Sequence, residues 1–188
     1  METYLNTIRS ALIDYLPEKP QDQRHILYDS MVYMLQTKSK CIRPLLVCAV
    51  SEYLNEPIEK TLALGCALEY VHTYSLIHDD LPAMDNDDWR RGQEACHIAF
   101  GEDVAILSGD CLQIYAIECL ATQLIKHYDA KRIVSVIAEF SKALGLYGMA
   151  GGQHLDLFFS NCDVKPDQPV FESINQLKTG ALLSLPFS

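Results

Sequence analysis

The chain has 188 residues, of which 49% are hydrophobic and 21% are charged. This composition supplies enough apolar surface for one sizeable core and excludes a largely disordered chain. Fifteen basic residues against 25 acidic residues give a formal net charge of −10, which argues against general nucleic-acid binding. No run approaches 18 uninterrupted apolar residues, so we expect no stable membrane insertion.

The cysteines and the N-terminal segment favour a cytoplasmic protein. The seven cysteines are scattered, mostly within apolar runs, and form no CxxC pair. An odd number of such cysteines indicates reduced thiols buried in a core, and the sequence shows no clustered zinc ligands. The first 16 residues lack the basic-then-apolar order of a secretory signal segment.

Almost every long segment of the chain shows helical periodicity. Asp22, Asp103 and Asp129 are predicted N-caps, and Pro44 suits the first position of a helix. The segment 58–81 is apolar on most sides, which predicts a central helix. Because strand patterns are weak, we predict an all-α single domain over residues 1–188. The predicted helices cover residues 3–16, 22–36, 44–54, 58–81, 103–127, 129–147 and 149–157, with another after Pro169.

The segment HDDLPAMDNDDWRRG (78–92) concentrates carboxylates at the end of the most apolar predicted helix. Side chains this crowded repel one another unless a cation lies between them. On an uninterrupted helix, Asp79 and Asp85 would lie about 120° apart. Pro82 disfavours a regular helix here, and a kink or bulge can bring the two carboxylates to face each other. An open pair of carboxylates suits Mg²⁺, which takes its remaining ligands from water and phosphate.

Arg90 and Arg91 follow this cluster directly and suit bidentate binding of phosphate oxygens. A calcium loop is the competing metal site, but the segment lacks the glycine and the distal glutamate of an EF-hand. A solvated acidic turn with surface arginines is the other interpretation, and the charge pattern alone leaves it open.

HDDLPAMDNDDWRRG resembles the first aspartate-rich motif of the trans-isoprenyl diphosphate synthases, in the form DDxxxxD followed by RRG. Four further motifs occur in the same order as in this family, so the resemblance extends over essentially the whole chain. They are KCIRP (40–44), which is similar to GGKRxRP; HTYSLIH (72–78); GGQHLDL (151–157), which is similar to GGQxxDL; and KTGAL (178–182), which is similar to KTGxL.

The resemblance implies a bundle of long antiparallel helices around a central apolar cavity, assembled as a homodimer. It also implies condensation of isopentenyl diphosphate with an allylic diphosphate, with Mg²⁺ as the cofactor. Metals and cationic side chains would stabilise the charge on the leaving diphosphate, most strongly in a dry cavity. The spaced motif and the aromatic Tyr74 resemble bacterial farnesyl diphosphate synthases, which make a C15 product.

The family's functional residues are carried over by position. The expected Mg²⁺ ligands are Asp79 and Asp85, with Asp80 in support. Arg90 and Lys178 would bind the allylic diphosphate, and Thr179 and Gln153 would lie near the carbocation. Tyr74, with Ser75 beside it, would limit chain length by closing the cavity. Isopentenyl diphosphate would be held by Lys40, Arg43, His72 and Arg91. For His72, a hydrogen-bonded core histidine is the alternative; for Tyr74, simple core packing.

Two departures from the family pattern affect these expectations. Lys38-Ser39-Lys40-Cys41 stands where the family has GGKR, which removes one arginine and two flexible glycines. The second aspartate-rich motif is absent, and the apolar end of the chain indicates truncation. The alternatives are therefore a catalytically weak or regulatory subunit, a longer-chain (C20) synthase, and, last, a terpene cyclase or head-to-head condensing enzyme.

Overall fold

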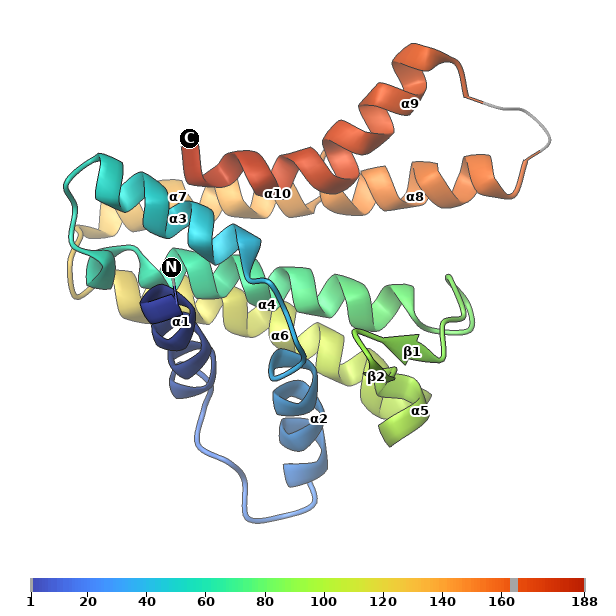
Figure 1. The fold of residues 1–188 in the computed structure, drawn as a ribbon, viewed down its shortest axis with the longest axis horizontal. Helices are drawn as coiled ribbons and strands as arrows, with labels where there is room; N and C mark the ends of the chain where they lie inside the picture. Colours follow the sequence, from blue (N-terminus) through green and yellow to red (C-terminus); the bar gives the residue numbers. More distant parts are fainter. Residues whose placement is uncertain (1, 163–165, 188) are drawn as a thin grey trace. The chain divides into compact units, whose positions relative to one another are not determined.

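The computed structural model (Figure 1) describes residues 2–162 and 166–187, and these are overwhelmingly helical, as predicted. The chain divides into two compact units, one ending at His127 and one beginning at Tyr128. Each unit is described by itself below. The expectation of one domain over the whole chain stays a prediction.

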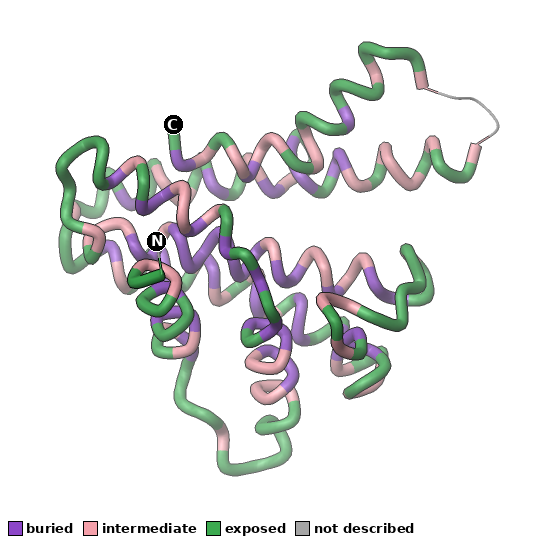
Figure 2. Tube along the Cα trace, viewed as in Figure 1, coloured by how far each residue is buried: buried purple, intermediate pink, exposed green. Residues whose placement is uncertain are grey.

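The first unit is built around α4 (Leu62–Asp79), the helix that the sequence predicts to be central. Figure 2 shows buried positions along most of its length, and Cys66, Leu68 and Tyr70 are fully enclosed. It packs mainly against α6 and α3, and also against α1 and α2. The other helices of this unit are α1 (Glu2–Asp14), α2 (His25–Leu35), α3 (Ile42–Tyr53), the short 3₁₀ turn η1 (Ile58–Lys60), α5 (Cys96–Phe100) and α6 (Glu102–Leu124).

The helix starts confirm one predicted cap and correct three other positions. The Asp129 carboxylate accepts the backbone N–H of Arg132 at 3.1 Å and caps α7. Asp22 is not a cap, because α2 begins three residues later. Asp103 lies inside α6, whose cap is Gly101. Pro44 lies in the first turn of α3, two residues after its start, where a missing N–H breaks no helical hydrogen bond.

A two-stranded hairpin interrupts the helices between α4 and α5. Strand β1 (Trp89–Arg90) pairs antiparallel with β2 (Gln93–Glu94). The two connecting residues, Arg91 and Gly92, have φ values of 53° and 86°, as a two-residue type I′ turn requires. Strands of two residues are too short to show alternating apolar and polar side chains, so the sequence predicted no strand here.

The second unit consists of helices in sequence order, from α7 (Ala130–Leu144) and α8 (Met149–Ser160) to α9 (Gln168–Asn175). A π-helical turn, η2 (Gln176–Gly180), joins α9 to α10 (Ala181–Ser184) and the 3₁₀ turn η3 (Leu185–Phe187). The turn η2 packs on α8. A Cβ at Gly152 of α8 would lie 2.3 Å from the backbone nitrogen of Lys178, so the glycine permits this close approach.

The expectation that composition excludes a membrane span needs correction. Two stretches of the described chain, Glu102–Leu124 and Ala130–Ser160, reach the length and hydropathy of a span, with mean hydropathies of 1.5 and 1.3. Helices of a protein core meet the same criterion of length and composition, so these stretches assign no membrane segment. All seven cysteines are free thiols, and five of them are buried.

Candidate functional site

The aspartate-rich segment folds into a compact turn at the end of α4. The helix ends at Asp79, and the backbone N–H of Asp85 then donates to the carbonyl oxygen of Asp79 at 2.8 Å. A second hydrogen bond joins the N–H of Asn86 to the carbonyl of Leu81 at 3.1 Å. The chain therefore reverses around Pro82 and returns residue 85 to the backbone of residue 79, as the sequence interpretation required.

Asp80 points away from this rim and into the protein. Its side chain is fully buried, and both carboxylate oxygens accept hydrogen bonds from Arg90, at 2.9 and 3.1 Å from Nε. Burial raises the pKa of Asp80, and the hydrogen bonds from Arg90 oppose that shift. The prediction that Asp80 supports a metal ion as a ligand does not fit this position, because its oxygens are occupied by a guanidinium.

Arg90 is held by two aspartates on the inner side of the hairpin. Besides Asp80, its Nη2 donates to the exposed Asp87 at 3.1 Å. The hydrogen bond to Asp80 raises the pKa of Arg90, which keeps the guanidinium charged. The Arg90 guanidinium is therefore fixed next to the aspartate turn, where the sequence predicts that it binds a diphosphate.

The turn fits a magnesium ion that is only partly coordinated by protein. Among the described residues, no group of three or more histidine, cysteine, aspartate or glutamate side chains is arranged to hold a metal. Asp79, the last residue of α4, and the exposed Asp85 in the following turn are joined by a backbone hydrogen bond and are the two candidate carboxylate ligands. Such a pair suits Mg²⁺ with water and phosphate completing its shell, and it does not suit a closed structural metal site.

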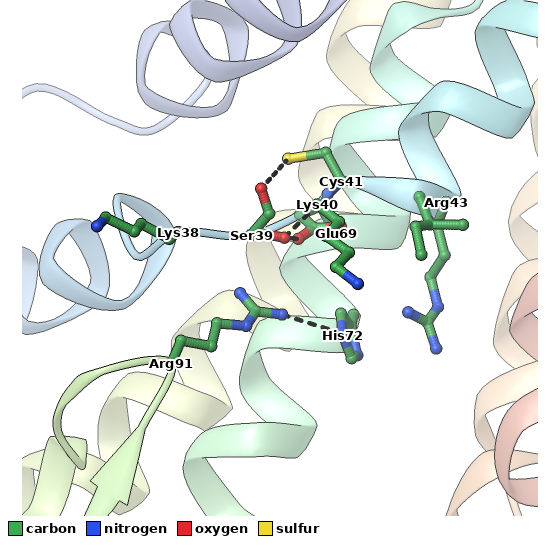
Figure 3. Close-up of a pocket in the computed structure, with 9 residues that line it drawn as sticks. Lys38, Ser39, Lys40, Cys41, Arg43, Glu69, His72 and Arg91 are labelled. Carbon is green, nitrogen blue, oxygen red and sulfur yellow. Dashed lines mark hydrogen bonds between the residues drawn. The ribbon is translucent and has the colours of Figure 1, made fainter.

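A pocket of about 260 Å³ in the same unit brings together four residues from three separate motifs. These are the residues expected to hold isopentenyl diphosphate: Lys40, Arg43, His72 and Arg91. Figure 3 shows the cationic ends of Lys40, Arg43 and Arg91 arranged around His72. The side chain of Lys38 points away from them. Three cationic side chains in one recess suit the binding of phosphate oxygens.

His72 is a neutral hydrogen-bond acceptor in this pocket. Its Nε2 lies 3.1 Å from Nη2 of Arg91, and an arginine can only donate, so the imidazole proton resides on Nδ1. Burial, with further contributions from Arg43 and Arg91, lowers the pKa of His72 to about 3. The Nη1 of Arg91 donates to the hydroxyl of Thr37 at 3.1 Å. His72 and Thr37 therefore fix the direction of the Arg91 guanidinium.

Glu69 and Ser39 belong to this pocket and were not predicted from the sequence. Glu69 is 2% exposed, and its Oε1 accepts the hydroxyl of Ser39 at 2.5 Å. A single carboxylate in the apolar run ALEYVHTY, three residues before His72, was the available signal. Neither Lys38 nor Ser39 takes the positive φ that the family's glycines would permit; Cys41 does so instead, with φ of 45°.

Tyr74 lies on α4 between the two sites and is 9% exposed. Its ring packs edge-on against His78 at 5.6 Å between centroids, and its hydroxyl is hydrogen-bonded by Gln113 of α6. The Ser75 hydroxyl donates to the carbonyl of His72 at 2.9 Å within the same helix. Core packing of Tyr74 is established by these contacts, and its role in chain length stays a prediction.

The remaining predicted residues lie in the second unit. The Lys178 ammonium donates to Asp156 of α8 at 2.5 Å, which joins the KTGAL and GGQHLDL motifs. Lys178 and Thr179 lie in the π-helical turn η2, and such turns are frequent at functional sites. The side-chain amide of Gln153 is buried with no hydrogen-bond partner among the described residues. This unsatisfied amide is available to a bound group.

Comparisons with known proteins cover nearly the whole chain. Geranylgeranyl diphosphate synthase of Cyanophora paradoxa is 44% identical over 185 residues, which are 96% of this chain and 60% of that protein. Farnesyl diphosphate synthase of Bacillus subtilis (strain 168) is 40% identical over 162 residues, with coverages of 86% and 54%. The chain thus spans little more than half of the length of these relatives.

Solved structures show the same fold. The crystal structure of an FPP/GFPP synthase from Zymomonas mobilis superposes with a TM-score of 0.94 at 41% identity, over 98% of this chain and 66% of that one. A geranyltransferase from Legionella pneumophila gives a TM-score of 0.91 at 36% identity, over 99% of this chain and 65% of that one. A family profile described as polyprenyl synthetase matches residues 24–188, and the chain therefore belongs to the polyprenyl synthetase family.

Proposed function

We propose that this protein is a short-chain trans-prenyl diphosphate synthase that condenses isopentenyl diphosphate with dimethylallyl or geranyl diphosphate to give farnesyl diphosphate (C15). The observation that carries the proposal is the pocket in which Lys40, Arg43, His72 and Arg91 converge. The same unit presents Asp79 and Asp85 on one turn at the end of α4. A prenyl transfer needs two such diphosphate sites, one for each substrate.

The residues of the chain divide the reaction between binding and leaving-group stabilisation. Lys40, Arg43 and Arg91 bind the diphosphate of isopentenyl diphosphate, and His72 orients Arg91. Mg²⁺ held by Asp79 and Asp85 would supply charge neutralisation for the departing diphosphate. The family resemblance assigns binding of the allylic diphosphate to Arg90 and, in the second unit, to Lys178. The allylic C–O bond breaks, the alkene forms the new C–C bond, and one proton is lost to the released diphosphate.

The product length and the assembly extend this proposal. Tyr74, with Ser75, is proposed to close the cavity at C15, and Thr179 and Gln153 to stabilise the carbocation as dipoles. Relatives named farnesyl and geranylgeranyl diphosphate synthases match at similar identity, which keeps a C20 product as the second candidate. A cytoplasmic homodimer is proposed from the family pattern.

A catalytically weak or regulatory subunit is the other candidate, because Lys38-Ser39-Lys40-Cys41 replaces a glycine- and arginine-rich motif. Turnover distinguishes it from a synthase. The purified chain is incubated with labelled isopentenyl diphosphate, geranyl diphosphate and Mg²⁺, and the products are analysed after phosphatase treatment. Farnesol supports the proposal, and geranylgeraniol supports the C20 candidate.

Two variants make this assay specific to the aspartate turn. Asp79→Ala removes a proposed Mg²⁺ ligand and should abolish turnover while the helical circular dichroism is retained. Asp88→Ala changes an exposed aspartate of the same segment and should leave turnover near the unmodified rate. A folded chain that forms no prenyl product from isopentenyl diphosphate and geranyl diphosphate would contradict the proposal and favour the regulatory subunit.

A further inference from the structure

The segment that leads into α3 is fastened to α4 by one serine. Ser39 is 8% exposed, and its hydroxyl donates to Oε1 of Glu69 at 2.5 Å. The Oγ of Ser39 also accepts the backbone N–H of Cys41 at 3.1 Å. Both hydrogen-bonding functions of the hydroxyl are therefore used, one toward α4 and one toward the residue that precedes α3 (Figure 3).

This hydroxyl determines where the pocket's cations lie. Lys40 is the residue between Ser39 and Cys41, and Arg43 is the second residue of α3. Cys41 has the left-handed φ of 45°, which a non-glycine residue adopts at a cost of about 1 kcal/mol. The N–H contact with Ser39 supports this conformation. A shift of Ser39 would therefore move both cations relative to His72 and Arg91.

Glu69 is the fixed point of this arrangement, and its charge is only partly compensated. Its Oε2 is buried and has no hydrogen-bond partner within the described chain. The Nε of Arg43 is also buried without a partner, and the Glu69 charge acts on Arg43, while burial lowers the pKa of that guanidinium. The arginine that the family pattern has at position 41 is a cysteine here. A buried carboxylate needs a donor, and Ser39 is the one that the structure supplies.

We propose that Ser39 is the positioning residue of the diphosphate pocket, acting through Glu69 and Cys41 to hold Lys40 and Arg43 toward the ligand. Ser39 thus takes over the organising role that a cationic side chain at position 41 would have beside Glu69. This inference rests on the proposed function, because it assigns the ligand of the pocket as the diphosphate of isopentenyl diphosphate.

The test measures binding rather than turnover. Isopentenyl diphosphate and inorganic diphosphate are titrated separately into the full chain by calorimetry. The fluorescence of Trp89, the single tryptophan, serves as a second signal, since it lies two residues from Arg91 on the hairpin. Ser39→Ala removes the hydroxyl and should weaken binding of both ligands at least about tenfold, which corresponds to about 1.4 kcal/mol.

Two further variants separate positioning from a loss of stability. Ser39→Thr retains a hydroxyl and should bind within about threefold of the unmodified chain, a difference of about 0.7 kcal/mol. Ser51→Ala removes another buried serine, which is 2% exposed; its hydroxyl donates to the Val47 carbonyl, and neither residue lines the pocket. It should leave both affinities unchanged even if the thermal midpoint falls.

The outcomes separate the two proposals. If the unmodified chain binds isopentenyl diphosphate and Ser39→Ala binds it equally well, the role of Ser39 is overturned while the proposed function stands. The same conclusion follows if Ser39→Ala and Ser51→Ala lose affinity to the same extent. If the unmodified chain binds neither ligand, the proposed function is overturned, and this inference with it.

Discussion

Individual side chains of the candidate sites differ in burial. Lys40 and Asp85 are exposed and Arg91 is half-buried, and Lys40 and Arg91 line the pocket. The carboxylates of Glu69 and Asp80 are buried and accept hydrogen bonds from Ser39 and Arg90 respectively. The sequence named the proposed binding side chains through its motif resemblance, and their roles stay predictions. It did not predict the roles of the buried carboxylates, since those depend on contacts between distant segments.

Because His72 is neutral in the folded protein, we expect the free energy of unfolding to depend on pH. The folded pKa of about 3 lies below the ordinary value of 6.5, so the unfolded chain binds the proton more tightly and stability falls as the pH drops through this interval. Between pH 7 and pH 5 the loss due to His72 should be about 2 kcal/mol. The charged groups near His72 are Lys40, Arg43, Arg90 and Arg91 on other elements and Glu69 on α4 itself.

Urea unfolding of His72→Gln at the two pH values measures this contribution. The variant should lose about 2 kcal/mol less than the unmodified chain over the same interval. His127→Gln, at an exposed position of the same unit, is the control and should follow the unmodified chain. Identical pH profiles for His72→Gln and the unmodified protein would show that the imidazole is not held neutral.

Truncation of the Tyr74 side chain should change the length of the product rather than the rate of turnover. If its ring closes the cavity five residues before Asp79, about 7.5 Å along the helix, Tyr74→Ala should yield products longer than C15. Tyr74→Phe keeps the ring, loses the contact with Gln113, and should retain the C15 product. Chromatography of the dephosphorylated products measures the outcome. An unchanged product from Tyr74→Ala would leave Tyr74 as a packing residue only.

The charged residues proposed for catalysis lie where helices and turns end or bend. The end of α4 at Asp79, the type I′ turn at Arg91 and the π-helical turn at Lys178 each place one charged group. Periodicity predicted the long helices and the break at Pro82. The hairpin was missed because four paired residues carry no period, and the π-helical turn because its sequence continues a helical pattern.

The hairpin should depend on Asp80 far more than on Asp87, although both bind Arg90. Asp80 is fully buried, so Asp80→Asn leaves the guanidinium without its enclosed partner and should cost about 2–3 kcal/mol. The Asp87 side chain is 55% exposed, and Asp87→Asn should cost less than about 1 kcal/mol. Denaturation of the two variants gives the comparison. Equal costs would contradict the buried position of Asp80.

The contact between α8 and the π-helical turn predicts the effect of a single methyl group. Gly152→Ala would place a Cβ 2.3 Å from the Lys178 backbone nitrogen, so this variant should lose about 1–3 kcal/mol through overpacking. Gly180→Ala is the matched helical control. Its Cβ would lie 3.6 Å from the nearest neighbouring atom, Cγ of Gln176, which is an ordinary van der Waals contact, and the variant should be neutral or slightly stabilising. Thermal midpoints that fall equally for both would contradict the close packing.

At the scale of the whole molecule, the chain combines a recognisable family fold with an altered 38–41 segment in the pocket lining. The fold class and the family resemblance were predicted from five ordered motifs and are confirmed by the solved structures and the family profile. The division into two compact units was not predicted, because helical patterns run without a linker from one unit to the next. Substitutions in the 38–41 segment are visible in the sequence, but their compensation by Ser39 and Glu69 requires the structure.

The most direct test of the account is crystallographic. Crystals of the chain are soaked with Mn²⁺, as an anomalous substitute for Mg²⁺, together with a bisphosphonate analogue of the allylic diphosphate. The account predicts an anomalous peak about 2.0–2.2 Å from carboxylate oxygens of Asp79 and Asp85, with phosphonate oxygens completing the shell and Asp80 still bound to Arg90. A turn that stays free of metal and phosphonate while both are bound elsewhere would contradict it.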